Sequence, residues 1–129
     1  MLAVMWLAAM LAGVVHVVIF CMESLWWTSP KVRERFRQTA EQADATRLFA
    51  FNQGFYNLFL AIGTFAGLVM ILLHHPRVGV TLVAWNCLSM VGAAIVLAAS
   101  APRMWRGALI QGAAPLVFLM LGAVRIATS

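Results

Sequence analysis

Two ionisable side chains, His16 and Glu23, interrupt an apolar stretch that runs from residue 2 to residue 27. A carboxylate in lipid is costly, so its presence indicates either a partner or a functional task. The i, i+7 spacing is close to two helical turns, which places both side chains on one helix face, roughly 10 Å apart along the axis. They cannot bond each other at that separation, so we expect a ligand, a water molecule or another helix between them.

Amide and hydroxyl groups in the later apolar stretches are the expected partners. The candidates, most of them at helical i, i+4 spacing, are Asn52, Gln53, Tyr56, Asn57 and Gln111. Antiparallel helices put them at the depth of Glu23, so the sequence predicts one polar pocket with His16 as its floor. Pro115 frees the carbonyl of Gln111 and favours a bend there. Asn86 comes from the opposite leaflet, and we interpret it as a packing contact between helices.

Simpler interpretations of these residues stay open. Asn, Gln and Tyr side chains often join membrane helices as plain packing contacts, at about 0.6 kcal/mol each. Glu23 lies near the end of its apolar stretch, where it could reach headgroup water or pair with Arg47. Both interpretations predict a packed bundle without a pocket.

The composition assigns the chain to the membrane. Hydrophobic residues make up 64% and charged residues 10% of its 129 residues, which leaves too little polar surface for a soluble domain. The net charge of +5 comes from lysines and arginines that lack the aromatic residues of a recognition motif, so nucleic acid is not an expected partner. Cys21 and Cys87 have no metal-ligand spacing, and neither a metal nor a cofactor is predicted.

Continuous apolar runs near the length of a membrane helix define the predicted spans, about residues 2–27, 49–73, 78–100 and 108–128. Short connections favour antiparallel neighbours. We therefore predict an all-α fold, an up-down four-helix bundle in the lipid bilayer, formed as a single domain over residues 1–129. The first stretch lacks the basic start and the cleavage site of a signal peptide, so we expect it to be a retained span.

The connection between the first two spans carries its own helical pattern. Ser29 and Pro30 predict the start of a short amphipathic helix on the cytoplasmic leaflet. Its apolar positions, at helical spacing, are Val32, Phe36, Ala40 and Ala43. Asp44 is expected to cap the next helix, and a solvated charged linker is the alternative interpretation of the whole segment.

Basic residues are distributed unevenly along the chain. Every lysine and arginine except Arg77 and Arg125 follows the first or the third span. By the positive-inside rule, both basic connections are expected in the cytoplasm and both termini outside. Trp26, Trp27 and Trp105 lie near span ends, where aromatic rings prefer the membrane interface.

Pairs of small residues at i, i+4 spacing predict close helix packing. Gly63 and Gly67 form a GxxxG pair, and Ala9 and Gly13 form a similar one. Such pairs let helix backbones approach closely, either within the bundle or across a homodimer.

The second span carries the sequence NQGFYNLFL at residues 52–60. It resembles the NQGxYNxFL signature of a bacterial membrane family known as domain of unknown function 1304. His16, Glu23 and the tryptophans after them are similar to that family's H-x(6)-E-x(2,3)-W element, Phe36 to its loop phenylalanine, and the segment from Gln111 to Pro115 to its QGxP element with one extra residue. The family's AGxYG element has lost its tyrosine here, at residues 90–95. The resemblance implies a bacterial inner membrane protein with a four-helix fold, and it implies no activity.

Three functions fit these patterns. A polar pocket formed by the candidates above could bind or transport a small polar or amphipathic molecule, including a lipid. Alternatively, Glu23 and His16 could act as acid and base on a lipid-soluble substrate. The third possibility is an accessory subunit that packs against a larger membrane complex.

Overall fold

The computed structural model describes residues 1–128 and consists of helices and their connections. Its long helices are apolar and long enough to cross a bilayer, where the first of them includes a short π-helical continuation. They are α1 (Leu2–Phe20) with its π-helical continuation η1 (Cys21–Leu25), α3 (Ala40–Leu72), α4 (Pro76–Ser100) and α5 (Trp105–Ala127). The short elements are α2 (Pro30–Arg35) and η2 (Pro102–Met104). The protein is thus a polytopic membrane protein, as the sequence predicts.

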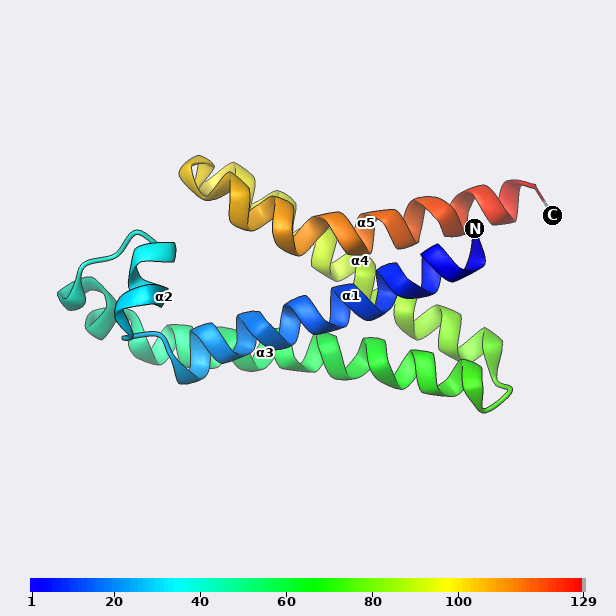
Figure 1. Ribbon diagram of the computed structural model, residues 1–129, viewed down its shortest axis with the longest axis horizontal. Helices are drawn as coiled ribbons and strands as arrows, with labels where there is room; N and C mark the ends of the chain where they lie inside the picture. Colours follow the sequence, from blue (N-terminus) through cyan, green and yellow to red (C-terminus); the bar gives the residue numbers. More distant parts are fainter. Residues whose placement is uncertain (129) are drawn as a thin grey trace.

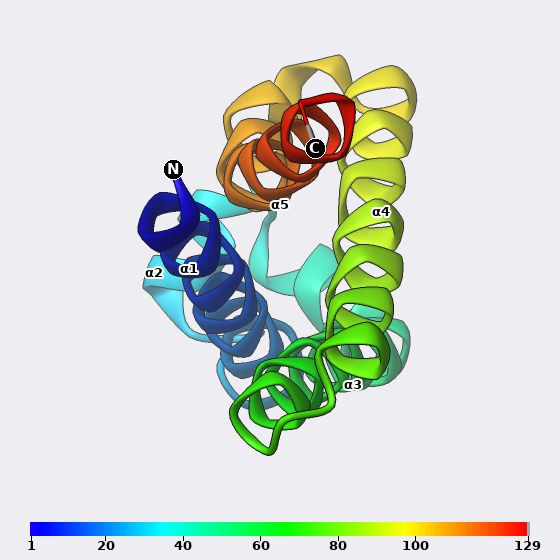
Figure 2. The same cartoon turned by 90° about the vertical axis from the view of Figure 1, so that its right-hand side faces the viewer.

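The long helices stand in a ring, which Figure 2 shows nearly end-on. Neighbours in the ring are α1 and α3, α3 and α4, α4 and α5, and α5 and α1, while α1 and α4 barely touch. The predicted all-α up-down bundle, with a short helix between the first and second long helices, is confirmed. The N-terminus and the described C-terminal end of α5 lie at one end of the bundle (Figure 1). The opposite end carries α2 and η2, and we call it the basic end.

The helix α3 begins well before the apolar span predicted from residue 49. Its N-cap is Thr39, whose hydroxyl accepts from the Gln42 amide at 3.1 Å while the Gln42 side chain accepts from the Thr39 amide at 3.0 Å. This capping box replaces the expected cap at Asp44, which lies inside the helix. With 33 residues, α3 is about 50 Å long, which exceeds the hydrocarbon thickness of about 30 Å. The excess length corresponds to residues 40–48, which carry Glu41, Asp44 and Arg47 and precede the predicted apolar span.

The predicted amphipathic helix is shorter than the pattern suggested. It starts after Ser29 but ends at Arg35, with Phe36 as its C-cap, and Arg37 then adopts a left-handed backbone with φ of 53°. Because the chain turns there, Ala40 and Ala43 belong to α3 and not to α2. The sequence pattern merged two helices because their apolar positions happen to continue in phase.

A small second core holds α2 against the bundle. Its buried members are Trp27, Val32, Ala43 and Ala50. The Trp27 indole Nε1 donates to the Ala43 carbonyl at 3.0 Å, and its ring packs tilted against Phe36 at 4.8 Å. Trp27 is only 9% exposed, so the expectation that it anchors the lipid interface is wrong. Its apolar ring and single donor are both satisfied inside the protein.

Small residues let α3 and α4 cross at close range. A Cβ added to Gly67 would lie 2.7 Å from Val83 Cγ2, and one added to Gly63 would lie 2.6 Å from Asn86 Nδ2. The GxxxG pair of α3 therefore packs within the chain, against α4. Asn86 is buried on this seam, and its amide donates to the Leu82 carbonyl of its own helix at 2.8 Å. It contributes packing, not a hydrogen bond between helices.

Gly79 should be a far less tolerant position than Gly92, although both lie in α4. A Cβ at Gly79 would overlap the Gly67 carbonyl and lie 2.9 Å from the Ile71 backbone nitrogen, whereas one at Gly92 would meet nothing within 4 Å. We expect Gly79→Ala to lower the free energy of unfolding by about 1–3 kcal/mol. Gly92→Ala should raise it by up to about 1 kcal/mol, since alanine favours helix. Denaturation in mixed detergent micelles, followed by circular dichroism, measures both; equal effects would contradict this packing.

Candidate functional site

The helices separate toward the basic end. There α1 and η1 stay beside α3, while α4 and α5 diverge from them as a second pair (Figure 1). Two hollows lie in this region, with volumes of about 430 and 810 Å³. The smaller is lined by Glu23, Trp27, Thr46, Phe49, Ala50, Asn52, Gln53 and Tyr56. The larger is lined by Ile19, Met22, Glu23, Lys31, Glu34, Arg35, Phe36, Arg37, Gln38, Leu97, Ala101, Arg103, Met104, Arg106, Gly107, Ile110 and Gln111. Glu23 lines both.

Glu23 is held by an amide from the neighbouring helix. Asn57 Nδ2 donates to Glu23 Oε2 at 2.8 Å and also lies 3.2 Å from the Gln53 carbonyl of its own helix. Asn57 is buried, and Glu23 is half-buried. A carboxylate accepts several hydrogen bonds, and this amide supplies one of them. The pairing leaves the carboxylate able to accept another from a bound molecule.

The backbone that carries Glu23 is a π-helical turn. The first helix changes from α to π at Cys21, and the Trp26 amide donates to the Cys21 carbonyl at 2.9 Å, five residues back. A π turn inserts one residue and rotates the side chains that follow it, and such turns occur often at functional sites. The straight-helix geometry predicted for His16 and Glu23 therefore ends before Glu23 is reached.

Gly54, at the centre of the α3 signature, allows the π turn to approach. A Cβ there would overlap the Ser24 hydroxyl and lie 3.0 Å from the Ser24 amide nitrogen. The Ser24 hydroxyl donates to the Phe51 carbonyl at 2.8 Å, which fastens η1 to α3 directly beside Glu23. Phe20 and Phe55 add an edge-on ring contact at 5.2 Å in the same seam. The glycine thus sets the distance at which Glu23 and Asn57 can meet.

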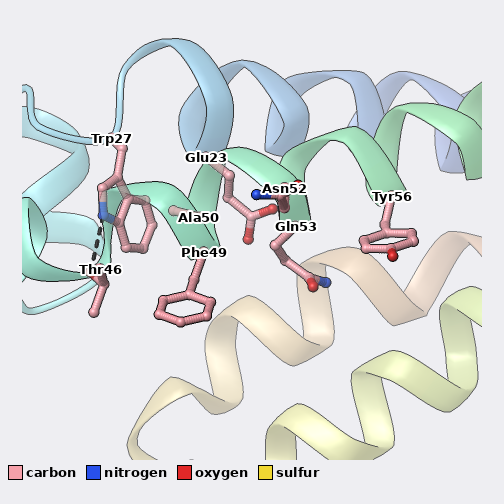
Figure 3. A pocket seen from close by; sticks show the side chains of 8 residues that line it. All are labelled: Glu23, Trp27, Thr46, Phe49, Ala50, Asn52, Gln53 and Tyr56. Carbon is pink, nitrogen blue, oxygen red and sulfur yellow. Dashed lines mark hydrogen bonds between the residues drawn. The ribbon is translucent and has the colours of Figure 1, made fainter.

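The remaining α3 candidates lie on the open side of the helix. Asn52, Gln53 and Tyr56 are exposed and line the smaller hollow with Glu23. In Figure 3 the side chains of Glu23, Phe49 and Gln53 extend toward the same side. Asn52 Nδ2 donates to the Leu48 carbonyl of its own helix at 2.8 Å. The polar side chains of residues 52–57 are therefore divided. Asn57 is turned toward η1, whereas Asn52, Gln53 and Tyr56 line the smaller hollow.

The structure places the other two candidates differently. Gln111 is half-buried in α5 and lines only the larger hollow. His16 is 0% exposed, lines neither hollow, and its Nδ1 lies 2.9 Å from the Ala12 carbonyl. His16 Nε2 is buried without a hydrogen-bond partner among residues 1–128. Instead of one pocket floored by His16, the chain has two adjoining hollows with Glu23 in the lining of both.

Basic side chains are the part of this region that sequence reasoning did not assign to a site. The cations that line the larger hollow are Lys31, Arg35, Arg37, Arg103 and Arg106. In the sequence they indicate membrane topology, and no motif joins the two segments. Only the fold shows that the segments 31–38 and 101–107 both contribute side chains to the lining of one hollow. Among residues 1–128, no group of three or more His, Cys, Asp or Glu side chains could hold a metal ion.

Gly54→Ala should loosen the contact between η1 and α3. The added methyl group meets Ser24 and its backbone, so we expect the free energy of unfolding to fall by about 1–3 kcal/mol. Ser24→Ala in the same chain should restore part of this loss, because it removes the nearest atom but not the backbone contact. Gly122→Ala, in open space on α5, is the control. If Gly54→Ala proved as harmless as the control in micelle unfolding, the close approach described here would be wrong.

Comparison with known families identifies this arrangement with one of them. The family described as "Protein of unknown function (DUF1304)" matches residues 10–123, which include η1, α3 and the Gln111 region. No curated protein and no solved structure matches the chain. The match covers most of the sequence and agrees with the resemblance seen in the α3 signature. The chain therefore belongs to the DUF1304 family.

Proposed function

We propose that the protein binds a small amphipathic molecule in the larger hollow, with Glu23 as the polar anchor. The observation that carries this proposal is the position of the Glu23 carboxylate. It belongs to a membrane-spanning helix, it is held by Asn57, and it faces two adjoining hollows instead of a closed core. A carboxylate at such a place is costly, and a bound hydrogen-bond donor would offset that cost.

The lining of the larger hollow matches an amphipathic ligand. Ile19, Met22, Leu97 and Ile110 supply apolar surface, and Gln111 adds an amide. Its volume of about 810 Å³ lies within the range of small-molecule sites, which combine apolar walls with a few placed polar groups.

The acid–base alternative receives less support from the geometry. It requires His16 and Glu23 to reach one substrate, but His16 lines neither hollow and its Nδ1 lies against the Ala12 carbonyl. Binding of an amphipathic ligand requires Glu23 but not His16. The excess of lysine and arginine at the basic end favours a cytoplasmic position for it, so the ligand would be taken from the inner leaflet.

Photolabelling with a defined amphiphile tests this proposal. The probe is a long-chain alcohol with a diazirine in its alkyl chain, added to the purified protein in lipid nanodiscs. We expect crosslinks concentrated in peptides that contain Ile19, Met22 and Ile110. Glu23→Ala should lower this labelling at least about fivefold, since the hydroxyl loses its acceptor.

Glu41→Ala is the matched control, because it removes a carboxylate by the same substitution from the first turn of α3, at a residue that lines neither hollow. Its labelling should equal that of the unchanged protein. Labelling spread evenly over the lipid-facing residues, and unaffected by Glu23→Ala, would overturn the proposal.

A further inference from the structure

We infer that the molecule bound in the larger hollow carries a phosphate group; this rests on the proposed function and names the chemical class of its ligand. The cations in its lining come from both sides. Lys31, Arg35 and Arg37 belong to the segment around α2, and Arg103 and Arg106 to η2 and the start of α5. Glu34 and Glu23 are the acidic side chains of the same lining. The hollow therefore has an excess of positive charge.

These cations are not used in ion pairs. Within residues 1–128 none of them forms a salt bridge with a carboxylate, although Glu34 lies in the same lining. Each is exposed on the rim of the hollow, while Gln111 and Glu23 are more buried. Arg106 also lies over the Trp105 ring, at 5.4 Å from its centroid, which leaves its charge uncompensated. Cations without carboxylate partners around one opening repel each other, and an anion placed between them would relieve that repulsion.

Phosphate fits this rim better than a carboxylate does. It offers more oxygen acceptors and more negative charge, and guanidinium groups bind it through paired hydrogen bonds. Cations that approach from two separate segments can share one phosphate group, whereas a carboxylate has only two oxygens to share. The rim thus suits a phosphate ester, and Glu23 suits a hydroxyl or ammonium group on the same molecule.

The apolar lining indicates where the rest of the ligand lies. Ile19, Leu97 and Ile110 lie inside membrane-spanning helices. The cations lie in the segment around α2 or, in the case of Arg103 and Arg106, at the very start of the last span. A phosphate at the rim with an alkyl chain against these walls has the orientation of a phospholipid in the adjacent leaflet. A soluble phosphate compound would use the same cations but not the walls, and the two sources are separated by experiment.

The positive-inside rule by itself places cations at this end without any site. Arg47 distinguishes the two explanations, because it lies in the first turns of α3 at the same end but lines neither hollow. If the cations had only a topological role, Arg47 and Arg103 would contribute equally to the affinity for a ligand. If they form a phosphate site, only Arg103 contributes to that affinity.

Native mass spectrometry of the purified full chain, released from a neutral detergent, tests the inference. The probes are dioleoyl phosphatidic acid, dioleoylglycerol with the same chains but no phosphate, and inorganic phosphate. We expect phosphatidic acid to bind at least about tenfold more tightly than dioleoylglycerol, and Arg103→Gln to remove about tenfold of that affinity. Arg47→Gln should change it less than about twofold.

Each outcome decides between defined alternatives. If inorganic phosphate binds as tightly as phosphatidic acid and depends on Arg103, the phosphate site stands and its ligand comes from water. If both lipids bind equally and depend on Glu23, the phosphate inference fails while the proposed amphiphile site remains. If Arg47→Gln weakens phosphatidic acid as much as Arg103→Gln does, the cations attract lipid without a site and the inference fails. If neither lipid nor phosphate binds, both proposals fail.

Discussion

A carboxylate inside a membrane-spanning helix must obtain from protein groups the hydrogen bonds that water would otherwise give it. Asn57 meets this demand for Glu23 through a 2.8 Å contact between helices. Several neighbouring features make that contact possible. The π turn carries the carboxylate, Gly54 leaves room for the turn, and Ser24 fastens it to α3. If the contact between η1 and α3 were lost, Glu23 would lose its hydrogen bond to Asn57.

The second constraint is how the ring of helices is packed. Toward the end that carries the N-terminus, Gly67 and Gly79 bring the backbones of α3 and α4 together, and toward the basic end the helices diverge. Close packing at one end and separation at the other is what leaves hollows inside so small a bundle. The connections then bring cations to the wider end. The close contact between α3 and α4 and the two hollows are therefore consequences of the same helix packing.

The sequence predicts the class and the helices well, because long apolar runs have few alternatives in a bilayer. It also singles out Glu23 and Asn57, since polar residues in such runs stand out. It does not predict the π turn, whose inserted residue leaves no pattern in the apolar residues. The break at Arg37 is hidden because Ala40 and Ala43 continue the helical phase. The sequence also does not predict that the segments around α2 and η2 line one hollow. That depends on how the helices diverge, which no local pattern encodes.

The distance between Glu23 and Asn57 in a lipid bilayer is the most direct test of the central claim. Magic-angle spinning NMR on protein with ¹³C-labelled glutamate and ¹⁵N-labelled asparagine side chains measures it. The 2.8 Å hydrogen bond places the carboxyl carbon and the amide nitrogen within about 4 Å. We predict strong carbon–nitrogen dephasing for one glutamate, lost in Asn57→Ala. No dephasing, or dephasing that survives Asn57→Ala, would contradict the claim that this amide holds the carboxylate in the membrane.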